Sequence, residues 1–368
     1  MDLPIRVLQV FAQMNRGGAE TMIMNIYRNI DRSKVQFDFV VHTELECDFD
    51  DEIQRLGGKI YKVPLYNGKN HFQYSQAWKL FFEDHPEYRI IHGHVRSTAS
   101  VYLSIAKRYK LVTIAHSHNT SSGTGFSAFA KNVLQYPIRY IADHLFACSN
   151  SAGQWLYGFN SMRKKNFHII NNSIATQDFI FNYQSRERIR KEFQVENKFV
   201  IGHVGRFHKQ KNHDFLIDVF KSIHEKNGNS ILMLVGDGPL RKSIEEKVKN
   251  VGLTNQVIFT GVRSDIPELL QAMDVFAFPS LYEGLGIVAV EAQAAGLPCI
   301  VSDKLPNEVL VTNLIKKEKI NKTKYWVNSI LEFNETKERT DTSDQIKSNG
   351  YDIEESTEWL ERFYLKNV

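Results

Sequence analysis

VFAFPSLYEGLGIVAVEAQAAGLPCIVS, residues 275–302, joins a short apolar run, a glycine turn, an alanine-rich segment and a second apolar run. The apolar run 275–278 predicts a buried strand, and residues 287–295 predict a helix that a glycine and a proline end. A new strand is expected from residue 299. This succession of strand, helix and strand is typical of a parallel α/β sheet.

Two glutamates, Glu283 and Glu291, lie on either side of the start of this helix. On one helix, eight steps of about 100° would leave them roughly 80° apart, so Glu283 is assigned to the loop and Glu291 to the helix. Loops at the carboxyl ends of parallel strands bind ligands in open α/β sheets, and a glycine turn exposes backbone amides. The turn is therefore a candidate binding site. The alternative is a solvated loop acid beside a helix-surface acid.

The length of 368 residues is long for one α/β core and predicts two domains, with a cleft between them as the default ligand site. Hydrophobic content of 42% and charged content of 24% are typical of a soluble globular protein. We find no apolar run of about 18 residues and no signal-peptide pattern, so a cytoplasmic protein is expected. Three separated cysteines without CxxC spacing predict no structural zinc site.

The net charge of +4 is unevenly distributed, because residues 1–170 carry 20 Lys and Arg against 14 Asp and Glu. We expect this basic half to face anionic lipid or a phosphate-bearing acceptor. The excess is too diffuse to indicate nucleic acid, and no nucleic-acid motif accompanies it. A stretch that mixes aromatic and basic residues, 126–143, is either an interfacial membrane helix or an ordinary core-facing helix.

Strand-like and helix-like segments alternate through both halves. In the first half, strands are expected at residues 5–11, 36–41, 59–63, 90–91, 111–115, 145–147 and 167–170. In the second half they are expected at 199–204, 231–235, 257–260, 275–278 and 299–301, and the charged segment 310–348 predicts surface helices. The predicted class is α/β, with two Rossmann-like domains facing each other across a cleft. We place the first domain at 1–178, a linker at 179–197, the second domain at 198–350, and at 351–368 a last helix that is a candidate for crossing back to the first domain.

Two cations, Arg206 and Lys211, follow the first strand of the second half. A guanidinium grips a diphosphate through two parallel hydrogen bonds, and an ammonium adds a point charge, so the pair suits a leaving nucleoside diphosphate. The alternative is a basic surface loop. Gly236 and Asp237 form a tight turn after the next strand, to which we assign a supporting role.

Paired glycines, Gly17 and Gly18, link the first strand to its helix, where the backbone turns sharply or approaches a ligand. The loop is not GxGxxG. Asp38 lies within the second strand rather than near its end, where a dinucleotide-binding acid belongs. Both observations argue against an NAD dehydrogenase.

Histidines follow two neighbouring strands: His92 and His94 follow one, and His116 and His118, with Asn119, follow the next. We expect the four rings to line one cleft. A zinc cluster is conceivable, but no flanking acid or cysteine completes it. We favour a hydrogen-bonding role at the reacting group for His116, with His118 as the alternative, while His92 and His94 are expected to be packed polar residues.

Taken together, these residues resemble the retaining nucleotide-sugar glycosyltransferases of family 4, which have the GT-B fold, and among them the bacterial capsular and exopolysaccharide enzymes. The resemblance covers nearly the whole chain. It implies that Arg206 and Lys211 bind the diphosphate, Glu283 the donor sugar and Glu291 the ribose, and that His116 lies beside the reacting carbon. Further donor-side positions are Gly17, Gly18, Gly236, Asp237, Arg263, Gly284, Leu285 and Gly286, and the acceptor-side candidates are His118 and Asn119. Three departures from the family pattern are Ser173, where a glycine is common, Leu285, where a phenylalanine is common, and the lack of the usual glycine-containing stretch after Ser302.

The resemblance implies transfer of a hexose of the glucose, galactose or N-acetylhexosamine type from a UDP-sugar to a saccharide, with retention. The expected acceptor is a polyprenyl-diphosphate-linked oligosaccharide in surface polysaccharide synthesis, at the inner face of the cell membrane. The family needs no divalent metal, so no metal or other cofactor is expected. The alternatives are a UDP-sugar epimerase of the same fold and a non-catalytic nucleotide-binding module.

Overall fold

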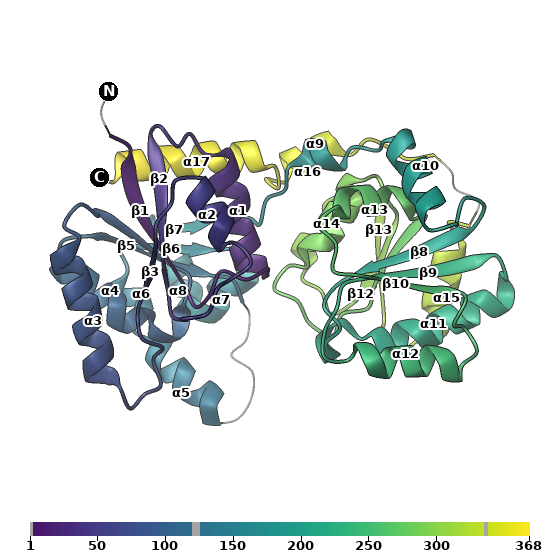
Figure 1. Cartoon of the computed structure of the whole chain (residues 1–368), viewed down its shortest axis with the longest axis horizontal. Helices are drawn as coiled ribbons and strands as arrows, with labels where there is room; N and C mark the ends of the chain where they lie inside the picture. Colours follow the sequence, from purple (N-terminus) through teal and green to yellow (C-terminus); the bar gives the residue numbers. More distant parts are fainter. Residues whose placement is uncertain (1–2, 120–125, 335–337) are drawn as a thin grey trace. The chain divides into compact units, whose positions relative to one another are not determined.

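The computed structural model describes residues 3–119, 126–334 and 338–368. It divides the chain into two compact units, shown in Figure 1. Unit 1 comprises Met1–Ile174 and Gly350–Val368, and unit 2 comprises Ala175–Asn349. Each unit has a parallel sheet flanked by helices, so the predicted α/β class with two Rossmann-like domains is confirmed.

Unit 1 is built on a 7-stranded sheet in the order β3-β2-β1-β4-β5-β6-β7. Its strands are β1 (Ile5–Phe11), β2 (Val35–Val41), β3 (Ile60–Lys62), β4 (Ile90–Gly93), β5 (Val112–Ser117), β6 (His144–Ala147) and β7 (Phe167–Ile169). Strand β1 pairs with β2 on one side and with β4 on the other, and both pairings are parallel. The strand order therefore reverses between β1 and β4, which is where open α/β sheets bind ligands, at the carboxyl ends.

The helices of unit 1 are α1 (Gly18–Asn29), α2 (Asp50–Arg55), α3 (His71–Asp84), α4 (Arg96–Arg108), α5 (Phe126–Gln135), α6 (Ile138–Ile141), α7 (Asn150–Tyr157), α8 (Phe159–Met162) and α17 (Ile353–Lys366). The predicted stretch 126–143 is two helices, because Pro137 has no N–H for a continuous helix. The last helix, α17, packs against α1 and β2, as Figure 1 shows. Its start is tied to the sheet unit by the backbone bond from Ile353 to Ile174, 2.9 Å long.

Unit 2 has a 6-stranded sheet in the order β10-β9-β8-β11-β12-β13. The strands are β8 (Phe199–Val204), β9 (Ser230–Val235), β10 (Val257–Gly261), β11 (Val275–Phe278), β12 (Cys299–Ser302) and β13 (Ile315–Glu318). Its α-helices are α9 (Thr176–Phe179), α10 (Tyr183–Glu192), α11 (His213–Lys226), α12 (Arg241–Asn250), α13 (Ile266–Ala272), α14 (Ile287–Ala294), α15 (Thr323–Leu331) and α16 (Ser343–Ser348), with 3₁₀ turns η1 (Lys209–Lys211) and η2 (Asn307–Val309). The order reverses between β8 and β11, which defines a second switch point.

Two segments differ from the sequence-based expectation. The charged range 310–348 contains an edge strand, β13, besides its helices, and Trp326 and Ile330 of α15 are fully buried. Strand β13 reads IKKE, and lysines on an edge strand hide the apolar alternation that identifies a strand. The range 179–197, expected as a linker, contains α10, whose Arg190 bonds to Asp274 and to backbone carbonyls of unit 2. It is therefore a packed part of unit 2.

None of the helices in the described ranges combines the length and the apolar composition that crossing a bilayer requires.

Candidate functional site

The switch point of unit 2 gathers the predicted cations and the first predicted acid. Arg206 and Lys211 follow β8, and Glu283 follows β11, the strand beside it. The Lys211 Nζ atom lies 2.7 Å from Glu283 Oε1 and 4.5 Å from the centre of the Phe278 ring. The two charged side chains are only 17% and 10% exposed, so this ion pair is largely desolvated. A phosphate that reached Lys211 would compete with Glu283 for the same ammonium group.

Arg206 is exposed and differs from Lys211 in having no fixed partner: within the described ranges, no hydrogen bond or ion pair holds its guanidinium. All five of its N–H donors are therefore available to a ligand that carries several acceptor oxygens, such as a phosphate. The sequence correctly places Arg206 and Lys211 on one loop, and the structure separates them into one free cation and one paired cation.

The turn at Gly236 and Gly238 supports the Arg206 loop by close packing. Both glycines have positive φ, 130° and 158°. A Cβ atom on Gly236 would lie 2.3 Å from the Gly205 carbonyl oxygen, and one on Gly238 would lie 2.7 Å from that of Phe207. The Phe207 amide donates to the Asp237 carbonyl at 2.9 Å. The backbone of this turn therefore holds the loop that carries Arg206, while the Asp237 side chain is largely exposed.

Glu291 lies on α14 and Glu283 lies in the loop before it, as the helix geometry predicted. Gly286 begins this arrangement with φ 87°, and a Cβ atom there would lie 3.0 Å from the Phe278 ring. Leu285 is only 3% exposed and serves as a packing residue of the loop. Burial raises the pKa of the Glu291 carboxyl to about 7, and no described side chain pairs with it. The site therefore contains an acid that carries its charge only partly at neutral pH.

Arg263, in the loop after β10, is already engaged. Its guanidinium lies 2.7 Å from Asp265 and 3.2 Å from Glu192, and the hydrogen bond to Asp265 raises its pKa. These two carboxylates hold the Arg263 side chain, so its guanidinium is not free to bind a ligand.

In unit 1, Gly17 precedes α1 and Gly18 begins it, and the Gly17 amide donates to the Asn15 carbonyl at 2.8 Å. Within the ranges that the structure describes, a Cβ atom on Gly18 would meet nothing within 4 Å, and one on Gly17 would approach the flexible Glu20 carboxylate, at 2.4 Å. Packing inside the unit therefore gives no reason for a glycine at position 18. The space beside Gly18 is open among the described residues.

The four predicted histidines form one stacked cluster at the carboxyl ends of β4 and β5. His92 Nε2 lies 3.1 Å from His116 Nδ1, and His94 Nδ1 lies 2.7 Å from His118 Nε2. The ring centres of His116 and His118 are 4.1 Å apart. Burial lowers the pKa of all four rings, that of His118 to about 3, so the cluster is neutral at physiological pH. Asn119 follows the cluster and is exposed.

His92, His94 and His116 each place one nitrogen within 4.8 Å of the other two, which is a spacing that a metal ion could bridge. No aspartate, glutamate or cysteine among the described residues joins this group. The nitrogens of His92 and His94 are engaged in hydrogen bonds to Gln9, Tyr364 and the other rings. The cluster therefore works as a hydrogen-bond network of neutral rings.

Gln9 and Tyr364 are site residues that the sequence interpretation missed. Gln9 is fully buried in β1, in the run IRVLQVF, and this polar residue within an apolar strand was the available signal. Tyr364 lies on α17 and had no such signal, since its partners are far away in sequence. Both are at the switch point of unit 1.

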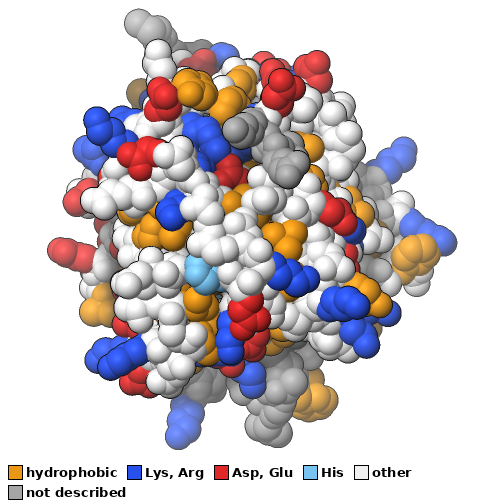
Figure 2. Space-filling view, turned by 90° about the vertical axis from the view of Figure 1, so that its right-hand side faces the viewer, with side chains coloured by type: hydrophobic (Ala, Val, Ile, Leu, Met, Phe, Trp, Pro, Cys, Tyr) orange, Lys and Arg blue, Asp and Glu red, His pale blue; other side chains and the backbone are white. Residues whose placement is uncertain are grey.

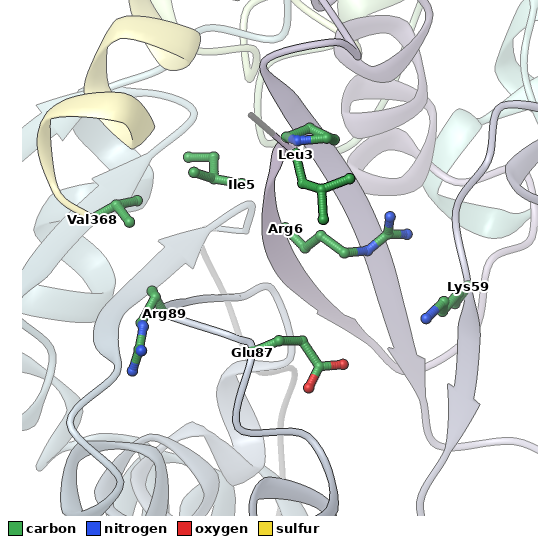
Figure 3. Close-up of a pocket in the computed structure, with 8 residues that line it drawn as sticks. Leu3, Ile5, Arg6, Lys59, Glu87, Arg89 and Val368 are labelled. Atoms are coloured by element: carbon green, nitrogen blue, oxygen red, sulfur yellow. The ribbon is translucent and has the colours of Figure 1, made fainter. Parts of the chain in front are cut away.

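A separate pocket of about 440 Å³, drawn in Figure 3, lies where strands β1, β3 and β4 begin. It is lined by Leu3, Pro4, Ile5, Arg6, Lys59, Glu87, Arg89 and Val368. Arg6 of β1 is held by Asp38 of β2.

The face drawn in Figure 2 carries positive and negative side chains interspersed, which is typical of a solvated surface. Neither feature competes with the switch points as a candidate site.

Comparison with known proteins finds matches to both units of the chain. The family model of Glycosyltransferase Family 4 matches residues 16–178, and that of Glycosyl transferases group 1 matches residues 185–351. "Putative glycosyltransferase EpsF" of Bacillus subtilis is 38% identical over 335 residues, which are 88% of this chain and 86% of that protein.

Two further proteins are similar in part or in fold. The UDP-Gal:alpha-D-GlcNAc-diphosphoundecaprenol alpha-1,3-galactosyltransferase of Escherichia coli is 33% identical over 183 residues, 47% of this chain and 46% of that protein. The crystal structure of Anabaena HepE in complex with UDP and glucose matches with a TM-score of 0.80 at 19% identity, over 98% of this chain and 99% of that one. With family models that match both units and a relative this similar over most of its length, the chain belongs to the family 4 glycosyltransferases of the GT-B fold.

Proposed function

We propose that this glycosyltransferase moves a hexose of the glucose, galactose or N-acetylhexosamine type from a UDP-sugar to a saccharide acceptor, in the synthesis of a surface polysaccharide. The observation that carries the proposal is the unit 2 switch point, where the free guanidinium of Arg206 accompanies the desolvated pair of Lys211 and Glu283. Two cations and one acid suit a ligand with a charged diphosphate at one end and sugar hydroxyls at the other.

The choice of donor and acceptor follows similar proteins. HepE has been crystallised with UDP and glucose, and the E. coli relative is named for UDP-Gal and a diphosphoundecaprenol-linked acceptor. We therefore propose UDP as the nucleotide and a polyprenyl-diphosphate-linked saccharide as the acceptor. Arg206 and Lys211 bind the diphosphate, Glu283 the sugar and Glu291 the ribose.

In the proposed mechanism, positive charge stabilises the departing UDP. Negative charge develops on the diphosphate as its bond to the sugar breaks, and preformed cations, of which Lys211 is largely desolvated, stabilise that charge. Arg206 and Lys211 supply the positive charge, so we propose that no divalent metal is needed. We propose retention at the anomeric carbon, with the acceptor hydroxyl attacking on the face that UDP leaves, so that a diphosphate oxygen takes the proton.

The test is a panel of nucleotide sugars, each incubated with and without a lipid-linked saccharide. UDP release that depends on the acceptor supports a transferase, and the anomeric configuration of the product, read by NMR, decides between retention and inversion. Conversion of the donor alone would indicate an epimerase. Binding of UDP-sugar without turnover on any acceptor would indicate a nucleotide-binding module.

We also propose peripheral attachment to the cell membrane through α5 and α6. Phe129, Val133 and Tyr140 are 65%, 57% and 67% exposed, and Lys131 and Arg139 accompany them. Exposed aromatic and aliphatic side chains beside basic ones are typical of interfacial helices. Phe129→Ser combined with Val133→Ser should abolish flotation with anionic liposomes. Equal flotation of this variant and the native protein would contradict the attachment.

A further inference from the structure

The histidine cluster of unit 1 is joined to two other buried side chains, Gln9 and Tyr364. The Tyr364 hydroxyl lies 2.7 Å from His92 Nδ1 and 3.3 Å from Gln9 Nε2. Gln9 Oε1 lies 3.0 Å from His94 Nε2. Gln9 and Tyr364 are fully buried, so their polar atoms need hydrogen-bond partners inside the protein. Each contact in the network must therefore join one donor to one acceptor.

The contacts determine which nitrogen of His94 and His118 carries hydrogen. Gln9 Oε1 only accepts, so His94 Nε2 donates to it, and the other nitrogen of this neutral ring has a lone pair. That lone pair faces His118 Nε2, which must therefore donate to it. His118 Nδ1 is left as a bare acceptor, and it is buried with no described partner.

The same reasoning fixes His92 and His116. The Tyr364 oxygen accepts from Gln9 Nε2, and its own hydrogen has His92 Nδ1 as its one remaining acceptor among the described contacts. His92 therefore carries its hydrogen on Nε2 and donates it to His116 Nδ1. His116 Nε2 then carries hydrogen, and it too is buried without a described partner.

The two chains are coupled through the Gln9 amide. If the amide were turned over, every hydrogen bond in both chains would reverse, and all four rings would carry hydrogen on Nδ1 instead. In either state, one of the two nitrogens without a described partner, His116 Nε2 and His118 Nδ1, is a donor and the other is an acceptor. The orientation in the structure makes His116 the donor and His118 the acceptor.

We propose that Gln9 and Tyr364 are positioning residues that hold all four histidines in the Nε2–H tautomer. His116 Nε2–H and His118 Nδ1, on rings stacked 4.1 Å apart, are then a buried donor and a buried acceptor that one hydroxyl of the sugar substrate would satisfy on reaching them. A hydroxyl accepts one hydrogen bond and donates another, so it satisfies both nitrogens, whereas each unsatisfied buried group otherwise destabilises the site. The identity of this ligand rests on the proposed function; the shared tautomer does not.

The direct test is NMR of the ligand-free protein with ¹⁵N-labelled histidine. Long-range ¹H–¹⁵N correlations distinguish the two neutral tautomers and the cation, and single His→Gln variants assign the four signals. We expect all four rings to be neutral Nε2–H tautomers. A mixture of tautomers among the four, a shared Nδ1–H state or a charged ring would overturn the proposal. Nitrogen signals that move with one equivalent of Zn²⁺ and return with EDTA would also overturn it, since they would identify a metal site.

Tyr364→Phe tests the positioning role, with Tyr27→Phe as the matched control. Tyr27 is also fully buried in unit 1 and makes two hydrogen bonds, to Gln36 and to the Leu56 carbonyl, away from the histidines. Tyr364→Phe should give mixed tautomers at His92 and His116 and lower kcat about tenfold, with KM for the donor nearly unchanged. Tyr27→Phe should keep the native tautomers and kcat.

A merely structural role for Tyr364 would lower Tm in both variants alike while leaving the tautomers and kcat intact, and this result would overturn the positioning role. The spectra need neither donor nor acceptor. Mixed tautomers in an active native enzyme would reject this inference and leave the proposed function standing. A shared tautomer without any transfer would do the reverse.

Discussion

Glu291→Gln should have opposite effects on two properties of unit 2: it should stabilise the fold at high pH and weaken the binding of the donor nucleotide. Burial raises the pKa of this carboxyl from 4.5 to about 7 in the folded protein. The folded state therefore binds the proton more tightly than the unfolded state, and stability is lost as pH rises from about 4.5 through 7. The full difference corresponds to roughly 3 kcal/mol above pH 8, and partial exposure of the residue reduces it to about 1–2 kcal/mol.

Glutamine has no charge to bury, so Glu291→Gln should raise the free energy of unfolding by about 1–2 kcal/mol at pH 8 and leave it unchanged near pH 4.5. Urea unfolding at the two pH values measures this. Glu246→Gln, on the exposed face of α12, is the control and should show no difference between them. At pH 8 the same Glu291 variant should weaken UDP binding about tenfold in calorimetry, because the ribose loses an ionised acceptor. A stability change of Glu291→Gln that is equal at both pH values would refute the reasoning.

Two further predictions concern the same site. Lys211→Met should lower the free energy of unfolding by about 1–3 kcal/mol, because it leaves Glu283 desolvated without its partner. Adding Glu283→Gln should restore most of that loss in urea unfolding without restoring transfer. Additive losses of stability in the double variant would contradict this. Gly238→Ala should cost about 2 kcal/mol or more, since the new Cβ atom meets Phe207 backbone at positive φ, whereas Gly18→Ala should leave Tm nearly unchanged and lower only donor turnover. Equal Tm losses in the two glycine variants would refute this contrast.

Much of the fold could be predicted because the chain repeats one strong local pattern. Strand β1 and strand β11 have the predicted bounds, since apolar runs with clear breakers set them. Strand β13 was missed because its lysines conceal an edge strand, and α10 was read as a linker because its arginines, charged in sequence, are paired with Asp274 in space. Local composition cannot show a partner that lies about eighty residues away.

The candidate site was predictable where its residues follow strand ends. Arg206 and Glu283 follow β8 and β11, and His116 lies at the carboxyl end of β5, so position along the chain made all three candidates. Gln9 and Tyr364 could not be found in this way, because their roles depend on donors and acceptors supplied by distant elements. A hydrogen-bond network has no spacing rule in sequence.

The central claim is that the cations of the unit 2 switch point bind the diphosphate of the donor, and one kinetic comparison tests it directly. Acceptor-dependent UDP release is measured for the native protein, Arg206→Ala, Lys211→Ala and the control Lys209→Ala, an exposed lysine in the same turn. We predict that the first two variants lose transfer by about a hundredfold or more while remaining folded, and that Lys209→Ala keeps native turnover. Native turnover by folded Arg206→Ala and Lys211→Ala, or an equal loss in all three variants, would contradict the account.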